Sequence, residues 1–320
     1  MGNTPGFTDR LFQIVTSCVV GLAISLNVYA EIDRATLALL ATSLVKVQVT
    51  TSQGGIGMGT GVVIARGKVI TNCHVTKDAE RIQLVQDGIQ WNVTAAAPDM
   101  YHDLCLLIVS GLNLPPLKIG TASKLNVGDE VTAAGFAFGG KAHFSQGNVH
   151  ALYAFDNGRV IRTNAPFAPG DSGGALVDRD GKLVGILSFF SGGANSFFAI
   201  PVDWFVERIG NMKAYQPIAP IADTPFWYRP TLAELPHFLQ AANFEARAQW
   251  SNLLTLSENW LRLTPNHPEA WLARGNALQQ IGDLAGATAA HIRAATLYSI
   301  LDQTAAQQLM LHNSITAARE

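Results

Sequence analysis

Short segments rich in β-branched residues, separated by glycine-containing turns, constrain the fold of this chain more than any other feature. Two of the separating turns carry Asp-Gly pairs, at Asp87 and Asp180, which are strong turn signals. Many short strands at regular spacing predict an all-β barrel or sandwich. The segments are 44–50, 59–65, 68–72, 81–86, 104–109, 129–136, 147–152, 160–164, 174–178, 182–190 and 196–201.

A helix is predicted where the strands end, because Val202, Phe205, Val206 and Ile209 lie at helical spacing. Five prolines then interrupt every continuing pattern, which predicts a semi-rigid linker or a surface strap over residues 213–236. These prolines are Pro217, Pro220, Pro225, Pro230 and Pro236.

Residues 237–320 are rich in alanine and are predicted to be helical. One stretch has the spacing of a tetratricopeptide repeat, and shifting it back by the repeat's period of about 34 residues gives a looser second unit. That earlier unit places Leu253 and Trp260 at positions that normally hold small residues. A plain helical hairpin packed on the β domain is the alternative. The repeat positions are Trp271, Gly275, Leu278, Ala287 and Ala294.

The 320 residues leave room for about two domains, since a domain averages roughly 150 residues. We expect a leader over residues 1–30, a β domain over 31–212, and the linker and helices that follow. A net charge of −2 with 14% charged residues gives no electrostatic footprint for nucleic acid or an anionic membrane.

The first thirty residues have the pattern of an export signal. Arg10 forms a basic end, residues 11–28 are largely apolar, and Ala30 offers a small residue for cleavage. The alternative is a retained membrane anchor, because the apolar run approaches the roughly 18 residues that span a bilayer. A lipoprotein cleavage box at Cys18 is disfavoured, because its apolar stretch is shorter than the roughly 7 residues an export signal needs. We therefore expect a periplasmic or secreted protein, contacting a membrane only if the segment is retained.

After such cleavage, Cys73 and Cys105 are the only cysteines that remain. An exported chain is in a disulfide-permissive compartment, so a bridge is one reading. Two small buried thiols in strands are the other.

The stretch APGDSGGAL places Ser172 among glycines just before a predicted strand. A serine hydroxyl is a weak nucleophile unless a positioned base takes its proton and an acid orients that base. His74 follows one predicted strand and Asp103 precedes another, so the chain offers His, Asp and Ser in that order. Each fragment alone is a modest signal, but together on an all-β chain they predict nucleophilic catalysis.

Residues 44–210 resemble a trypsin-like serine protease domain, closest to the bacterial high-temperature-requirement (HtrA/Deg) branch. The resemblance is carried by GTGVVI, KVITNCHV, DLCLL, FSQGNVHAL, TNAPFAPGDSGGAL and FFAIPVDW, in the family's order and approximate spacing. It implies two six-stranded antiparallel barrels with the catalytic residues between them. It also implies a serine endopeptidase acting on proteins or peptides.

By that resemblance Ser172 attacks the scissile carbonyl, His74 is the general base and acid, and Asp103 orients the imidazole. The backbone N–H groups of Gly170 and Ser172 would form the oxyanion hole. Ser188 matches the serine that supports the catalytic acid, and an ordinary strand residue is its alternative.

The resemblance also suggests a substrate preference. Pro166 stands at the floor of the primary specificity pocket in place of an acid, which disfavours Lys or Arg. Phe190 falls where open pockets carry glycine and is expected to narrow the entrance. We therefore expect cleavage after small or medium aliphatic residues.

Asp171 departs from the Deg branch, which usually has asparagine at this position. Trypsins with an acid here pair it with a new N-terminus, and this chain shows no obvious activation peptide. We expect another cation, from Arg159, Arg162 or Lys182. If no cation reaches Asp171, the loop that contains it is expected to rest in an inactive conformation until a trigger acts on it.

A second departure is that helices stand where Deg proteases carry PDZ domains, so residues 237–320 are expected to recruit a substrate or protein partner, or to cap the second barrel. A catalytically silent binding scaffold is the competing function. A serine esterase is disfavoured, because the parallel α/β pattern around its nucleophile is missing.

No cofactor or metal is expected. His102, His143 and His150 show no helical metal-binding spacing and are read as scattered surface histidines. The glycine-rich GMGTG precedes a β-rich run instead of a helix, unlike a nucleotide-binding fingerprint.

Overall fold

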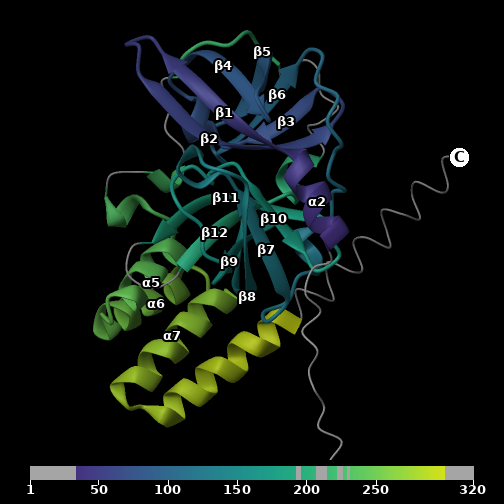
Figure 1. The fold of residues 1–320 in the computed structure, drawn as a ribbon. Coiled ribbons are helices and arrows are strands. Elements are labelled where there is room, and N and C mark those ends of the chain that lie inside the picture. Colours follow the sequence, from purple (N-terminus) through teal and green to yellow (C-terminus); the bar gives the residue numbers. More distant parts are fainter. Residues whose placement is uncertain (1–33, 192–195, 207–214, 222–225, 229–230, 300–320) are drawn as a thin grey trace, which may run out of the picture. The chain divides into compact units, whose positions relative to one another are not determined.

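The computed structural model describes residues 34–191, 196–206, 215–221, 226–228 and 231–299. Its strands form two closed six-stranded antiparallel barrels (Figure 1), which confirms the predicted fold. The first barrel has the strand order β1-β2-β3-β6-β5-β4. Its strands are β1 (Leu44–Thr51), β2 (Ile56–Ala65), β3 (Lys68–Thr71), β4 (Ala79–Gln86), β5 (Ile89–Asp99) and β6 (Leu104–Val109).

The second barrel closes in the order β10-β11-β12-β9-β8-β7. Because closure pairs every strand on both sides, neither barrel leaves a free sheet edge along its full length. Its strands are β7 (Glu130–Gly135), β8 (His143–Phe155), β9 (Gly158–Thr163), β10 (Ala175–Asp178), β11 (Leu183–Ser191) and β12 (Ser196–Pro201).

One strand, β5, is absent from the sequence prediction. It contains three consecutive alanines followed by Pro98, residue types that are depleted in strands. Pairing with β4 and β6 overrides that weak propensity. The turn that leads into it, Asp87-Gly88, has positive φ at both residues, as a tight hairpin with right-handed strand twist requires.

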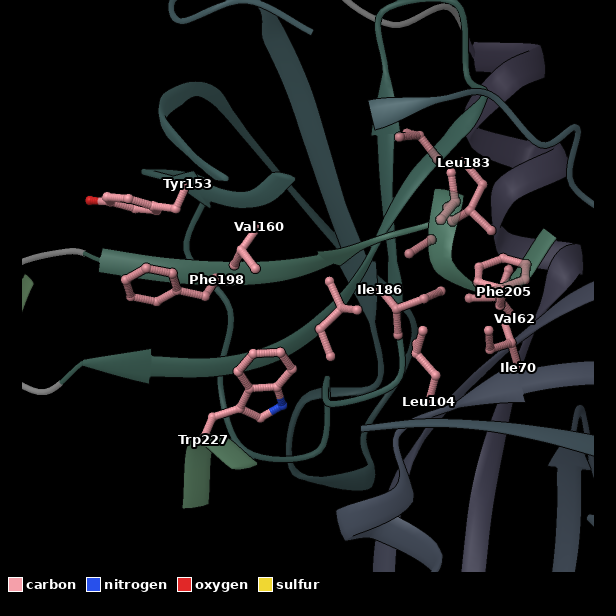
Figure 2. Close-up of a cluster of buried hydrophobic side chains, with 14 of the residues drawn as sticks. Val62, Ile70, Leu104, Tyr153, Val160, Leu183, Ile186, Phe198, Phe205 and Trp227 are labelled. Atoms are coloured by element: carbon pink, nitrogen blue, oxygen red, sulfur yellow. The ribbon is translucent and has the colours of Figure 1, made fainter. Parts of the chain in front are cut away.

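Each barrel has an apolar interior, and a third cluster joins the barrels to each other. Val62, Ile70 and Leu104 of the first barrel belong to the same buried cluster as Ile186 of the second barrel and Phe205, which follows that barrel, as Figure 2 shows. This shared core fixes how the two barrels meet.

Short helices and 3-10 turns accompany the barrels. Helix α4 covers Asp203–Val206, at the start of the predicted helix; residues 207–214 lie outside the described part. The expected leader, 1–30, also lies outside it. Among the described residues no helix is long and apolar enough to span a membrane. The remaining elements here are α2 (Arg34–Ser43), α3 (Cys73–Thr76), and turns at Ala122–Lys124, Ala137–Gly139, Phe226–Tyr228 and Leu232–Glu234.

The C-terminal region is helical in its described part. It contains α5 (His237–Ala246), α6 (Trp250–Leu263), α7 (Pro268–Ile281) and a further helix over 284–299. Gly275 of α7 packs so closely on His291 that an added Cβ would lie 2.2 Å from the imidazole ring. Whether these helices are tetratricopeptide-like stays a prediction.

The helices also pack on the second barrel. Phe238 of α5 stacks on Tyr153 of β8 at 5.0 Å, and the buried Glu269 accepts a hydrogen bond from the Ala154 N–H at 2.9 Å. Arg162 of β9 forms an ion pair with Glu245 of α5 at 2.9 Å. Barrel and helices therefore share buried apolar and polar contacts.

Candidate active site

His74 lies in the short helix α3, directly after strand β3. Its backbone N–H donates to Asp103 Oδ1 at 2.8 Å, and its ring Nδ1 lies 2.7 Å from Asp103 Oδ2. Because an ionised carboxylate only accepts hydrogen bonds, Nδ1 carries the proton in this pair. In the neutral imidazole, Nε2 is then the nitrogen free to accept a proton.

Asp103 is fully buried at the entry to β6 and has a φ of 59°, in the left-handed region. Its backbone carbonyl accepts hydrogen bonds from Asn72 Nδ2 at 3.0 Å and from the Cys73 N–H at 3.2 Å. The segments that carry His74 and Asp103 are thus tied together by backbone as well as side-chain contacts.

A disulfide joins Cys73 to Cys105, with the two Cα atoms 4.9 Å apart. It decides between the two readings left open by the sequence. The bridge attaches the residue before His74 to a strand residue two positions after Asp103, so it crosslinks the supports of both side chains.

Ser188 lies on β11 of the second barrel and is 2% exposed. Its hydroxyl donates to Asp103 Oδ2 at 2.8 Å, across the boundary between the barrels. The Asp103 carboxylate therefore accepts three hydrogen bonds, two from His74 and one from Ser188.

Ser172 lies between the barrels, in the turn before β10. Its backbone carbonyl accepts from the Thr60 N–H at 2.8 Å, which attaches the turn to the first barrel. Its hydroxyl lies 3.3 Å from the Ser188 carbonyl oxygen, and the structure gives no hydrogen bond between the described side chains of Ser172 and His74. The three predicted residues are thus brought to one place, with Ser172 turned toward Ser188.

The backbone of the predicted oxyanion site is held by its neighbours. The Phe138 N–H donates to the Pro169 carbonyl at 2.7 Å. The peptide between Pro169 and Gly170 is trans, so the Gly170 N–H points away from the direction of that carbonyl. Gly170 has a φ of 102°, and an added Cβ would lie 2.7 Å from the Phe136 carbonyl oxygen, so this position requires glycine.

Asp171 is fully buried, and its Oδ2 accepts from the Ala168 N–H at 2.8 Å. Burial raises the pKa of its carboxyl group. The expectation that a lysine or arginine pairs with it is wrong: the basic side chain beside it is His143, with Nδ1 3.4 Å from Oδ1. Arg159 instead donates to the carbonyls of residues 122, 123 and 125. Arg162 pairs with Glu245, and Lys182 pairs with Asp180.

His102 is not the surface histidine that the sequence suggested. It is 6% exposed, with Nδ1 2.6 Å from Asp99 and Nε2 2.7 Å from Asp156. Asp99 ends β5 of the first barrel and Asp156 lies in the β8–β9 turn of the second, so His102 bridges the barrels one residue before Asp103. Among the described residues, no cluster of His, Cys, Asp and Glu has a metal-binding arrangement.

Pro166 and Phe190 are the two residues predicted to shape the primary specificity pocket. Pro166 is exposed and its carbonyl accepts a hydrogen bond from Ser145. Phe190 is 49% exposed, and its ring centroid lies 6.4 Å from both Phe167 and Phe197. The described part of this region therefore presents apolar aromatic side chains.

Tyr228 is a residue of this site that the sequence analysis did not single out. Its hydroxyl lies 3.4 Å from His74 Nε2 and 3.2 Å from the Ser188 carbonyl oxygen. It belongs to the proline-rich stretch, where a run of three aromatic residues, 226–228, was the one available signal.

The two closed six-stranded barrels have the trypsin-like fold, and His74, Asp103, Ser172 and Ser188 lie in it as the sequence resemblance predicts. A family model described as a trypsin-like peptidase domain matches residues 59–186.

Two bacterial proteins are similar to this chain. A probable periplasmic serine endoprotease, DegP-like, of Pseudomonas putida strain W619 is 35% identical over 171 residues, which cover 49% of this chain and 35% of that protein. A probable periplasmic serine protease, do/HhoA-like, of Haemophilus influenzae is 36% identical over 159 residues, covering 45% and 34%. The chain thus spans about a third of the length of these curated relatives.

Two solved proteases share this fold. The HtrA-type protease AlgW with tripeptide superposes with a TM-score of 0.50 and 30% identity, covering 54% of this chain and 60% of that one. The Rv3671c protease from M. tuberculosis, in its active form, gives a TM-score of 0.55 over 60% and 89% of the two chains. At 23% identity the second likeness shows the fold alone.

Proposed function

We propose that this protein is an exported serine endopeptidase that cleaves peptide bonds through an acyl-enzyme intermediate. The observation that carries the proposal is the chain of contacts from Ser188 through the buried Asp103 to His74 Nδ1. It leaves His74 Nε2 unprotonated in the neutral imidazole, so that this nitrogen can act as the base that a nucleophilic serine requires. Export rests on the expected leader and on the periplasmic names of the relatives.

In the proposed reaction, Ser172 Oγ attacks the scissile carbonyl while its proton passes to His74 Nε2. The Gly170 and Ser172 N–H groups donate to the oxyanion that forms. His74 then gives the proton to the leaving amine, and a water molecule activated by the same histidine hydrolyses the acyl-enzyme. Asp103 holds the imidazole tautomer and stabilises the imidazolium in both steps.

The substrates proposed are proteins or peptides with small or medium aliphatic residues before the cleaved bond. Pro166 in place of an acid, and the aromatic rings of Phe167, Phe190 and Phe197, support an apolar pocket. Cleavage of a peptide panel preferentially after Arg or Lys would contradict this preference.

For the helical region, the proposals are recruitment of a substrate or partner, or capping of the second barrel. The buried contacts of Glu269 and Phe238 with β8 favour the cap.

The test of the main proposal is covalent labelling by a fluorophosphonate probe, which reacts with an activated serine. We expect the full chain to be labelled, and Ser172→Ala and His74→Ala to lose labelling by about 10⁴-fold or more. Folded protein that is not labelled under any condition would favour the binding-scaffold alternative.

A further inference from the structure

Trp227 holds the segment 226–228 against the second barrel. It is 6% exposed, and its ring stacks on Trp204 at 6.1 Å and on Phe189 at 5.8 Å between centroids. Buried aromatic stacking of this kind fixes a side chain without requiring backbone pairing. The next residue, Tyr228, is thereby directed toward the catalytic residues.

The chain on either side of this segment is attached to different barrels. Gln216 exchanges backbone hydrogen bonds of 2.9 and 2.8 Å with Ala96 of the first barrel. Helix α5 begins at His237 and packs on the second barrel. Residues 226–228 therefore lie between two attachments, Gln216 on the first barrel and helix α5 on the second barrel.

The Tyr228 side chain occupies the space beside His74 that the leaving group of a substrate needs. Its ring centroid is 4.6 Å from that of His74, and its hydroxyl is 3.4 Å from Nε2, the nitrogen that must receive the proton of Ser172. A peptide whose carbonyl met Ser172 would bring its leaving nitrogen to the same nitrogen of His74. The phenol ring and that leaving group cannot both lie there.

The second contact of Tyr228 is with the same carbonyl oxygen that Ser172 faces. The hydroxyls of Tyr228 and Ser172 both approach the Ser188 carbonyl oxygen, at 3.2 and 3.3 Å. Ser188 is skipped in the pairing of β11 with β12, whose register shifts between Leu187 and Phe189. Its carbonyl is therefore open to side chains, and an extended substrate would use such an unpaired strand group.

We propose that Tyr228 is an autoinhibitory residue that closes the catalytic centre until the segment 226–228 is displaced. This inference rests on the proposed function, since it presumes that Ser172 and His74 form an active pair once Tyr228 leaves. In the closed state the tyrosine engages the base and the Ser188 carbonyl, and Ser172 Oγ is not bonded to Nε2. Release of Trp227 from Trp204 and Phe189 frees the cleft for substrate.

The Tyr228 hydroxyl stays protonated in this position, because a tyrosine has an ordinary pKa of about 10. Burial and the charge of Asp103 raise the pKa of Tyr228. The phenol therefore remains a neutral donor to the Ser188 carbonyl at physiological pH.

The experiment compares fluorophosphonate labelling and peptide cleavage in the full-length wild type, Tyr228→Phe and Tyr228→Ala. Loss of one net hydrogen bond predicts labelling about fivefold faster in Tyr228→Phe. Loss of the ring as well predicts at least about a tenfold gain in Tyr228→Ala, seen in kcat/KM for a peptide too. Tyr215→Phe is the matched control, because it removes a tyrosine hydroxyl from the same stretch away from His74, and its rates are expected to equal those of the wild type.

Unchanged or slower labelling in folded Tyr228→Phe and Tyr228→Ala, with a labelled wild type, would overturn the autoinhibitory role and leave the peptidase intact. No labelling in any variant would instead remove the proposed function, and the autoinhibition with it. Thermal unfolding checks each variant, and if Tyr228→Ala fails to fold, Tyr228→Phe decides the question alone.

Discussion

Asp171 shows how burial sets the energetics of a single residue beside the nucleophile. Its carboxylate is fully buried against the Ala168 N–H and His143, and that burial raises its pKa. A raised pKa in the folded state means that the folded protein binds the proton more tightly than the unfolded chain does. The stabilisation is present below the ordinary aspartate value of 3.8 and is lost as pH rises through the higher folded value.

Asp171→Asn is therefore expected to stabilise the protein near neutral pH, since the amide is never ionised. Urea unfolding at pH 4.5 and pH 7.5 measures the effect, and carboxylates common to both proteins cancel in the comparison. The gain from the substitution is expected to be larger at pH 7.5. Equal effects of the substitution at the two pH values would mean that the pKa of Asp171 is the same in the folded protein as in the unfolded chain.

A separate prediction concerns Ser188, which orients the carboxylate of Asp103. Its hydroxyl donates to the buried Asp103 carboxylate, and a hydrogen bond to a charged group contributes about 2 kcal/mol. Ser188→Ala is expected to lose about that much free energy of unfolding and to lower kcat more than it raises KM. Ser188→Thr keeps a hydroxyl and serves as the control. A Ser188→Ala protein with wild-type stability and kcat would mean that His74 alone fixes the acid.

At the scale of secondary-structure elements, the disulfide between α3 and β6 makes the clearest prediction. It closes a loop with a sequence separation of 32, for which chain entropy gives a stabilisation of about 3–4 kcal/mol. The double variant Cys73→Ala, Cys105→Ala is expected to unfold at correspondingly lower denaturant and to lose activity, because the bridge flanks His74 and Asp103. Unfolding of the wild type with and without reductant repeats the measurement without a substitution. Identical midpoints in all these samples would contradict the prediction.

Most strands were predictable because β-branched residues and glycine turns signal them locally, as in 59–65 and 182–190. Strand β5 was not, since its alanines and Pro98 give a weak local signal that pairing on both sides overrides. The site residues His74, Asp103 and Ser172 stand in recognisable motifs. Tyr228 does not, because its contact with His74 joins residues 154 positions apart through a proline-rich stretch that has no periodicity.

The partner of Asp171 shows a related limit. The sequence analysis expected a cation from Arg159, Arg162 or Lys182, whereas the fold places His143 of β8 beside Asp171. Likewise His102 gave no periodic signal, and its two carboxylate partners come from different barrels. Long-range pairings of polar groups are set by the tertiary fold, and local patterns do not contain them.

At the scale of the whole molecule, the described barrels and helices behave as parts of one folded unit. A single buried cluster contains Val62 of the first barrel, Ile186 of the second and Trp260 of α6. The ion pair of Arg162 with Glu245 adds a polar contact that is well shielded from solvent. We therefore expect one cooperative unfolding transition, with tryptophan fluorescence and circular dichroism giving the same midpoint.

Removal of residues 237–320 tests that expectation and the role of the helices together. Deletion exposes Tyr153 and Phe198 of the second barrel and leaves the Ala154 N–H without its Glu269 acceptor. We expect loss of folding, and equal loss of small-peptide and protein-substrate cleavage. Glu245→Ala in the full chain is the milder variant, because it removes only the carboxylate that pairs with Arg162. Leaving that guanidinium without its partner is expected to lower the free energy of unfolding by about 3 kcal/mol. Cleavage of the peptide and of the protein substrate is then expected to be lost in parallel on warming. A folded truncation that cleaves peptides normally but proteins poorly would instead assign the helices to substrate recruitment, because only capture of a large substrate would then depend on them.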